Sequence, residues 1–244
     1  MPRLNNAQEL FRYLNSVTKY TIQTGTIGDT TTSGPLAAGA STVPVTAITN
    51  FTSGDPAFLI GDGGVELISA IGTPATSMPI TNQKIAIAQS TGARFVEAVA
   101  IALGHVSDAG ATFGGTQQLT PVPAATSRSA LTFLKQSAEL TFSFALLGYN
   151  NLNLLAAFGA PESGETGTGT AADPHQALIG QSNIGTQSTQ CIRLMGDRID
   201  GKTVQVDLLD VTIEVNVSAQ IGTATPAGIT IAGKMGAVIQ RIYT

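Results

Sequence analysis

The most specific chemical signature in the sequence is the run GDRIDGKT at 196–203, which matches the phosphate-loop formula G-x-x-x-x-G-K-T. Such a loop binds phosphate because its lysine and threonine open a helix whose amide groups point at the ligand. Residues 204–217 instead alternate apolar and polar side chains with the period of a strand. Asp197 and Asp200 would also place two carboxylates beside the phosphates. The motif therefore predicts a hairpin turn and not a nucleotide site.

Two histidines could act as general bases, and each has an aspartate nearby: His105 precedes Asp108, and His175 follows Asp173. A hydrolytic triad also needs a positioned nucleophile, and the sequence has no G-x-S-x-G elbow. Cys191 opens an expected strand with no base beside it, which is typical of a buried, inert thiol. We therefore expect no catalytic residue and no enzymatic activity.

Metal and cofactor sites find equally little support. One cysteine and two histidines cannot build the common zinc sites. Asp55, Asp62 and Glu66 surround a glycine-rich turn, but their spacing departs from that of a calcium-binding EF-hand loop. A turn with aspartate at a favoured position is the simpler interpretation. The sequence predicts neither a metal nor a cofactor.

Composition points toward self-assembly. Only 11% of the 244 residues are charged, against about 25% in an average protein. The balance of 12 Lys+Arg against 16 Asp+Glu, −4 in total, lacks the basic footprint of a protein that grips nucleic acid or anionic membrane. No secretory signal or bilayer-spanning apolar run is visible. A surface with so little charge is suited to contact with copies of itself.

The N-terminal 99 residues are expected to form two units. Residues 1–35 are predicted as a helix over 5–19, in which Leu10, Leu14 and Val17 repeat at near-helical spacing, followed by an extended arm. Residues 36–99 contain short strand-like runs separated by Gly and Pro turns. This pattern predicts a small, inserted all-β module.

Residues 100–244 are expected to form the main β domain. The sequence predicts a loop-rich stretch over 104–130, an alternating strand over 137–146, a short helix after 148 and a long exposed loop over 160–190. Asp200-Gly201 predicts a hairpin. Beyond it, Val204 to Leu208 and Val211 to Val217 alternate out of phase, which predicts a β-bulge at 209–210, and a last strand covers 229–239.

The polar faces of the two clearest strands are the best candidate functional surface. They carry carboxylates, hydroxyls and amides, and neither strand adds a Lys or Arg to its polar face. Such a face repels a phosphate backbone at close range and offers it nothing to hold, although an ordinary solvated sheet face is an equally valid interpretation. If these faces line a channel, the candidate lining residues are Glu139, Thr141, Ser143, Gln205, Asp207, Thr212, Glu214 and Asn216.

The order of elements from about Thr126 to Thr244 resembles the major tail tube proteins of tailed bacteriophages. The resemblance lies in AELTFSFALL, the helix-like NNLNLLAAFG, a variable loop, the hairpin LMGDRIDGKTVQVDLLDVTIEV and the last strand GITIAGKMGAV. The segment GASTVPVTAITNFTSGDPAFLIGDGGVELISAI also looks like a small β-module that recurs in phage structural proteins. The inserted module is a departure from a minimal tube protein.

This resemblance implies a mainly β (α+β) fold, a β-sandwich or half-barrel tube domain with a flanking short helix. It implies hexameric rings, stacked head to tail into a virion tail that is assembled in the host cytoplasm. The tape-measure protein and DNA would pass through the lumen without specific binding. Sheath, baseplate and tail terminator proteins are further implied partners, with no membrane involved. The alternative function is a baseplate, fibre or adhesin-type binding module, but only 5% of the residues are aromatic.

Overall fold

The protein is mainly β, and its described residues include one short helix. The computed structural model describes residues 13–22, 25–123, 130–147, 150–158, 160, 165–168, 170–179, 190–197, 200–214 and 228–243. Its elements are β1 (Tyr13–Ile22), β2 (Asp29–Thr31), β3 (Thr42–Pro44), β4 (Ala57–Gly61), β5 (Gly64–Ile68), β6 (Ser77–Pro79), β7 (Arg94–Pro123), β8 (Ala130–Leu147), α1 (Asn151–Ala157), β9 (Glu165–Thr166), β10 (Gln176–Ala177), β11 (Gln190–Asp197), β12 (Thr203–Ile213) and β13 (Gly228–Tyr243).

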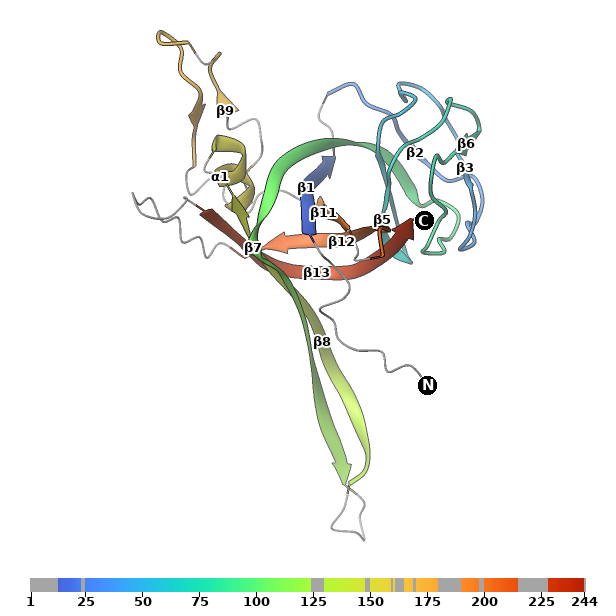
Figure 1. Cartoon of the computed structure of the whole chain (residues 1–244). Helices are drawn as coiled ribbons and strands as arrows, with labels where there is room; N and C mark the ends of the chain where they lie inside the picture. Colours follow the sequence, from blue (N-terminus) through green and yellow to red (C-terminus); the bar gives the residue numbers. More distant parts are fainter. Residues whose placement is uncertain are drawn as a thin grey trace.

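The main sheet is antiparallel and runs in the order β1-β11-β12-β13-β8-β7-β4-β5. Strand β1 also pairs with β7, so the path from β1 through β11, β12, β13, β8 and β7 returns to its start (Figure 1). A closed path protects strand edges that would otherwise be exposed.

Two segments of this sheet contribute to one apolar core. Segment I consists of β1, β11, residues 203–209 of β12, 237–243 of β13 and 98–104 of β7. Segment II consists of residues 210–213 of β12, 228–235 of β13, 140–147 of β8 and 105–116 of β7. Their buried side chains meet in a cluster that includes Val17, Ile192, Val206, Phe142 and Ile231.

Strand β12 passes from one segment to the other at Asp210. Val206 and Leu208 are buried in the core before this point, and Val211 after it, so the phase change expected from the sequence is present. The predicted bulge is wrong, because the pairing of β12 with β13 keeps one register throughout. The alternation of core-facing side chains shifts by one residue because Asp210 adopts a left-handed backbone conformation, with a φ of 51°. A Cβ at Gly236 would lie 3.1 Å from the Cβ of Asp210, so glycine gives this turn room.

The predicted helix over 5–19 is wrong for residues 13–19, which belong to β1, while residues 1–12 lie outside the described part of the chain. Val17 packs into the core and Tyr20 packs on the opposite side against the module. A strand buried on both faces has apolar residues without period-two alternation, so its pattern resembles that of a short helix.

The predicted loop-rich stretch over 104–130 is also wrong in its described residues. Strand β7 is 30 residues long, and beyond residue 116 it pairs only with β8 among the described strands. The two form a ribbon that projects away from the body, long and green in Figure 1. Gly104 and Gly110 have φ values of 90° and 72°, so glycines that suggested loops from the sequence lie within a strand that bends.

The small module has its own core, in which Phe51 stacks on Phe95 with ring centroids 5.5 Å apart. Its predicted span of 36–99 needs correction at both ends. Strand β2 lies within the expected arm but already pairs with β7. Strand β7 continues from the module into the main sheet, so no boundary separates residues 99 and 100. The buried Glu97 accepts hydrogen bonds from the backbone N–H groups of Gly28 and Thr52, which ties three parts of the module together.

Several local predictions are confirmed. The strand over 137–146 lies within β8, and the last strand is β13. The short helix is α1, whose N-cap Asn150 accepts a hydrogen bond of 2.8 Å from the backbone N–H of Asn153. The described part of 160–190 is largely exposed and contains the small β9–β10 pair. Among the described residues, no helix has the length and apolar character needed to cross a membrane.

Candidate functional site

The outward face of segment II brings together most of the predicted lining residues. Strand β8 supplies Glu139, Thr141 and Ser143, whose neighbours Phe142 and Phe144 point into the core. Antiparallel pairing places Thr141 opposite Lys234 of β13, which in turn is opposite Thr212 of β12. The face is therefore built from three adjacent strands, with β7 on the other side of β8. We call it the wet face: Glu139, Thr141, Ser143, Thr212, Glu214 and Lys234.

Lys234 neutralises part of the charge of the wet face. Its ammonium lies 3.0 Å from a carboxylate oxygen of Glu139 and 3.6 Å from one of Glu214, and all three side chains are about half exposed. The hydrogen bond to Glu139 and its charge raise the pKa of Lys234. Sequence reasoning missed Lys234 because it considered two strands, and the third strand supplies the cation. The alternation of Ile231 and Met235 with Lys234 in β13 could have identified it.

A shallow hollow of about 350 Å³ lies in the wet face. Its lining includes Thr112, Thr141, Ser143 and Glu214, with Phe142 among the apolar groups. These groups offer hydroxyls and one carboxylate, without a neighbouring histidine or thiol in the lining. The hydroxyls and the carboxylate of this lining can form hydrogen bonds with water or a polar ligand, and the lining lacks the paired base and nucleophile that acyl-transfer chemistry requires.

Gln205 and Asp207 do not belong to the wet face, and the expectation that they are solvated is wrong. They are 4% and 0% exposed, because the module packs over the side of β12 on which they lie. The alternation of polar and apolar residues in β12 was predicted correctly. In segment I, however, the module covers the polar side of the strand. Asn216 lies outside the described residues.

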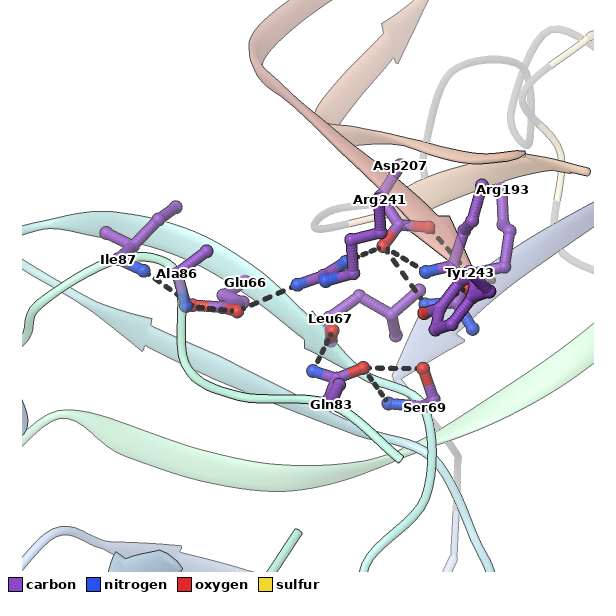
Figure 2. A network of polar contacts seen from close by, with 11 residues as sticks. Glu66, Leu67, Ser69, Gln83, Ala86, Ile87, Arg193, Asp207, Arg241 and Tyr243 are labelled. Carbon is purple, nitrogen blue, oxygen red and sulfur yellow. Dashed lines mark hydrogen bonds and ion pairs between the residues drawn. The ribbon is translucent and has the colours of Figure 1, made fainter. Parts of the chain in front are cut away.

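Asp207 is the centre of a buried ion network between the module and the main sheet (Figure 2). Arg193 of β11 donates to its two oxygens at 2.6 and 3.1 Å, and Gln205 donates at 2.8 Å. Arg241 of β13 donates to the same carboxylate from one nitrogen. The Arg193 guanidinium also lies 5.2 Å from the ring centroid of Tyr20. These converging donors replace the hydrogen bonds that the buried carboxylate would otherwise make with water.

Glu66 is the module's part of the same network. Arg241 donates to it at 3.0 Å from its second terminal nitrogen, so one guanidinium joins β5 of the module to β12 of the main sheet. The backbone N–H groups of Ala86 and Ile87 also donate to Glu66, at 2.8 and 2.9 Å. Burial raises the pKa of Glu66, and the two backbone hydrogen bonds partly oppose that increase. Glu66 is thus a structural carboxylate and not a calcium ligand beside Asp62.

The remaining sequence candidates lie apart from one another. The run GDRIDGKT connects β11 and β12, so a strand follows it and not a helix. His105 lies in β7, and His175 immediately precedes β10. Cys191 is buried, and burial raises the pKa of its thiol to about 12. Among the described residues, no group of three or more His, Cys, Asp or Glu side chains is arranged to hold a metal ion.

Segment II ends in two strand edges that lack a partner among the described strands. Residues 209–213 of β12 pair with β13 on one side, whereas β11 pairs with β12 only as far as residue 208. Residues 105–123 of β7 pair with β8 on one side, and β1 pairs with β7 only up to residue 104. Unpaired edges of this kind are ready templates for another strand.

Neither a protein-family model nor a curated protein matches this chain.

Proposed function

We propose that this chain is a structural subunit of the tail tube of a tailed bacteriophage. Its copies assemble into hexameric rings that stack into a conduit for DNA, and the tube domain is a β-sandwich. The subunit performs no catalysis and holds no cofactor. The single observation that carries this proposal is that the wet face lies on a sheet segment whose two edges have no partner among the described strands.

Closure between copies follows from those two edges. The free edge of β12 in one copy can pair with the free edge of β7 in the next, and the two edges differ, so the contact is head-to-tail. A head-to-tail contact whose rotation closes produces a ring. Continuous pairing around that ring satisfies the backbone groups of both edges and turns the wet faces of all copies to the same side.

The chemistry of the wet face suits a polymer that must pass without binding. Serine, threonine and glutamate offer no cationic contacts to phosphate, and the one lysine, Lys234, already has two carboxylates as partners. Counterion release, the main source of non-specific DNA affinity, requires lysine and arginine side chains that can reach the phosphates. A wall of this composition has little to hold DNA.

Electron microscopy of the purified protein at increasing concentration tests the proposal. We expect rings or tubes with a central channel, whereas monomers that persist at high concentration would contradict it. Rings without an open channel would favour a baseplate or fibre module over a conduit.

The double variant Glu139→Lys, Glu214→Lys tests the direction of the wet face. We expect tubes that form normally but retain DNA at low salt, because the channel then carries cations that bind phosphate. The matched control is Asp29→Lys, a charge reversal of an exposed module residue. Equal DNA retention by both variants would show that the wet face does not line the channel.

A further inference from the structure

The inserted module covers the side of segment I that points away from the core. Tyr20, Cys191 and Leu209 of segment I pack against Phe58 and Leu67 of the module in a separate apolar cluster. In β12, Leu209 faces the module while the adjacent Leu208 faces the core. Adjacent side chains of a strand point to opposite sides, so the module and the core lie on opposite sides of segment I.

The buried ion network fixes the module in this position. Arg241 connects Glu66 of the module with Asp207 of segment I, and both carboxylates are fully buried. Rotation of the module would expose the apolar cluster and separate these buried charges from their partner. Breaking a buried ion pair is strongly unfavourable because it leaves a charge without compensation. The module therefore has one orientation relative to the sheet.

The wet face lies on the far side of segment II. Thr141 and Ser143 are directed outward while Phe142 between them is directed into the core. The layers therefore follow in the order module, segment I, core, segment II, wet face. In Figure 1 the strands β3 and β6 mark the part of the module that lies farthest from the ring of strands.

We infer that the module forms the outer wall of the assembled tube, where it is the first part of the subunit that any protein binding from outside would meet. This inference rests on the proposed function: if the wet face lines the channel, a unit fixed on the opposite side of the core is directed outward. It assigns the insertion to external contacts and excludes it from the lining of the conduit.

Cysteine accessibility in assembled tubes tests the orientation. Ser77→Cys places a thiol on the exposed surface of β6, and Ser143→Cys places one on the wet face. The native Cys191 is fully buried and contributes little background. The probe is a maleimide on a long polyethylene glycol chain, which adds visible mass on a gel and is too bulky to enter a narrow channel. Dissociated subunits of each variant provide the reference rate.

We expect Ser77→Cys to react equally in tubes and in dissociated subunits, and Ser143→Cys to lose most of its reactivity on assembly. Loss of reactivity at both sites would overturn the inference, because the module would then lie between copies. Protection of Ser77→Cys alone would overturn it as well. Reactivity at both sites within tubes would instead overturn the conduit, since the wet face would then be open, and failure to assemble would overturn both proposals.

Discussion

Arg241 connects two buried carboxylates that belong to different parts of the fold, and its removal should affect the whole molecule. We expect Arg241→Met to lower the free energy of unfolding by about 3–5 kcal/mol, the usual effect of breaking a buried pair, because Glu66 and Asp207 both lose a cation. The control is Arg94→Met, which breaks an exposed pair with Asp29 and should change stability by about 0–1 kcal/mol. Chemical denaturation of both variants measures the difference, and equal values would contradict this assignment.

Glu66 should give stability an unusual dependence on pH. Because its pKa is raised by burial, the folded state binds a proton more tightly than the unfolded state does. The protonated Glu66 side chain therefore contributes its full stabilisation at pH values below 4.5, the ordinary pKa of the group. That stabilisation is lost as the pH rises through the raised pKa of the folded state. Glu66→Gln removes this titration. The difference in unfolding free energy between the native protein and this variant should shift in favour of the native protein as the pH falls. A flat or opposite trend would show that the pKa is not raised.

Among the candidate site residues, the alternation of polar and apolar residues identified those whose exposure depends only on their own strand. Glu139, Thr141 and Ser143 alternate with buried aromatic residues in β8, so their outward direction was visible in a short window. Gln205 and Asp207 have equally clear alternation in β12, yet the module covers them. Arg193 and Arg241 reach Asp207 from two neighbouring strands, and no local pattern pairs them. The side of the strand to which each side chain points was therefore predictable from the sequence. Whether that side is buried depended on contacts between residues distant in sequence.

At the level of elements, the close approach of β12 and β13 depends on Gly233. A Cβ at this position would lie 2.1 Å from the carbonyl oxygen of Thr212, which belongs to the backbone and cannot move independently. We expect Gly233→Ala to lower stability by about 1–3 kcal/mol through overpacking. For a protein of this size, each kcal/mol lowers Tm by roughly 2–4 °C.

Gly236→Ala is the matched control for this prediction, since it places the same methyl group in the same strand. Its nearest contact would be the Asp210 side chain at 3.1 Å, which can yield by a small movement. Thermal unfolding should therefore show the larger loss for Gly233→Ala. A larger loss at Gly236 would mean that the turn at Asp210, and not the approach at Gly233, limits the packing.

Elements with a strong local signal were predictable, and those shaped by their neighbours were not. Helix α1 has a capping asparagine, and the turn before β12 contains Asp200-Gly201, so both could be placed from short windows. Strand β1 is buried on both sides and therefore lacked alternation. Strand β7 contains glycines at its bends and polar residues on its exposed side, which together resemble a loop. Its pairing with β8 stabilises it as a strand.

At the scale of the whole molecule, the ribbon of β7 and β8 projects from the body without packing support from the rest of the described chain. A two-stranded ribbon is marginally stable in water unless a third strand or a packed face supports it. Beyond residue 116 of β7, the ribbon has no further partner among the described strands. Phe113 and Leu140 at its base are 43% and 37% exposed. In an assembly, neighbouring copies would cover these surfaces.

Replacement of residues 117–138 by Asn-Gly tests this role directly. Thr116 and Glu139 are paired across the two strands, so a two-residue turn can join them and keep both the register of segment II and the Glu139 side chain of the wet face. We expect the shortened protein to fold with nearly unchanged Tm, because the core is built from residues outside the ribbon. It should remain monomeric in sedimentation at concentrations at which we expect the full chain to form rings. Rings assembled by the shortened protein would mean that the ribbon is dispensable and that the free edge of β12 finds its partner elsewhere.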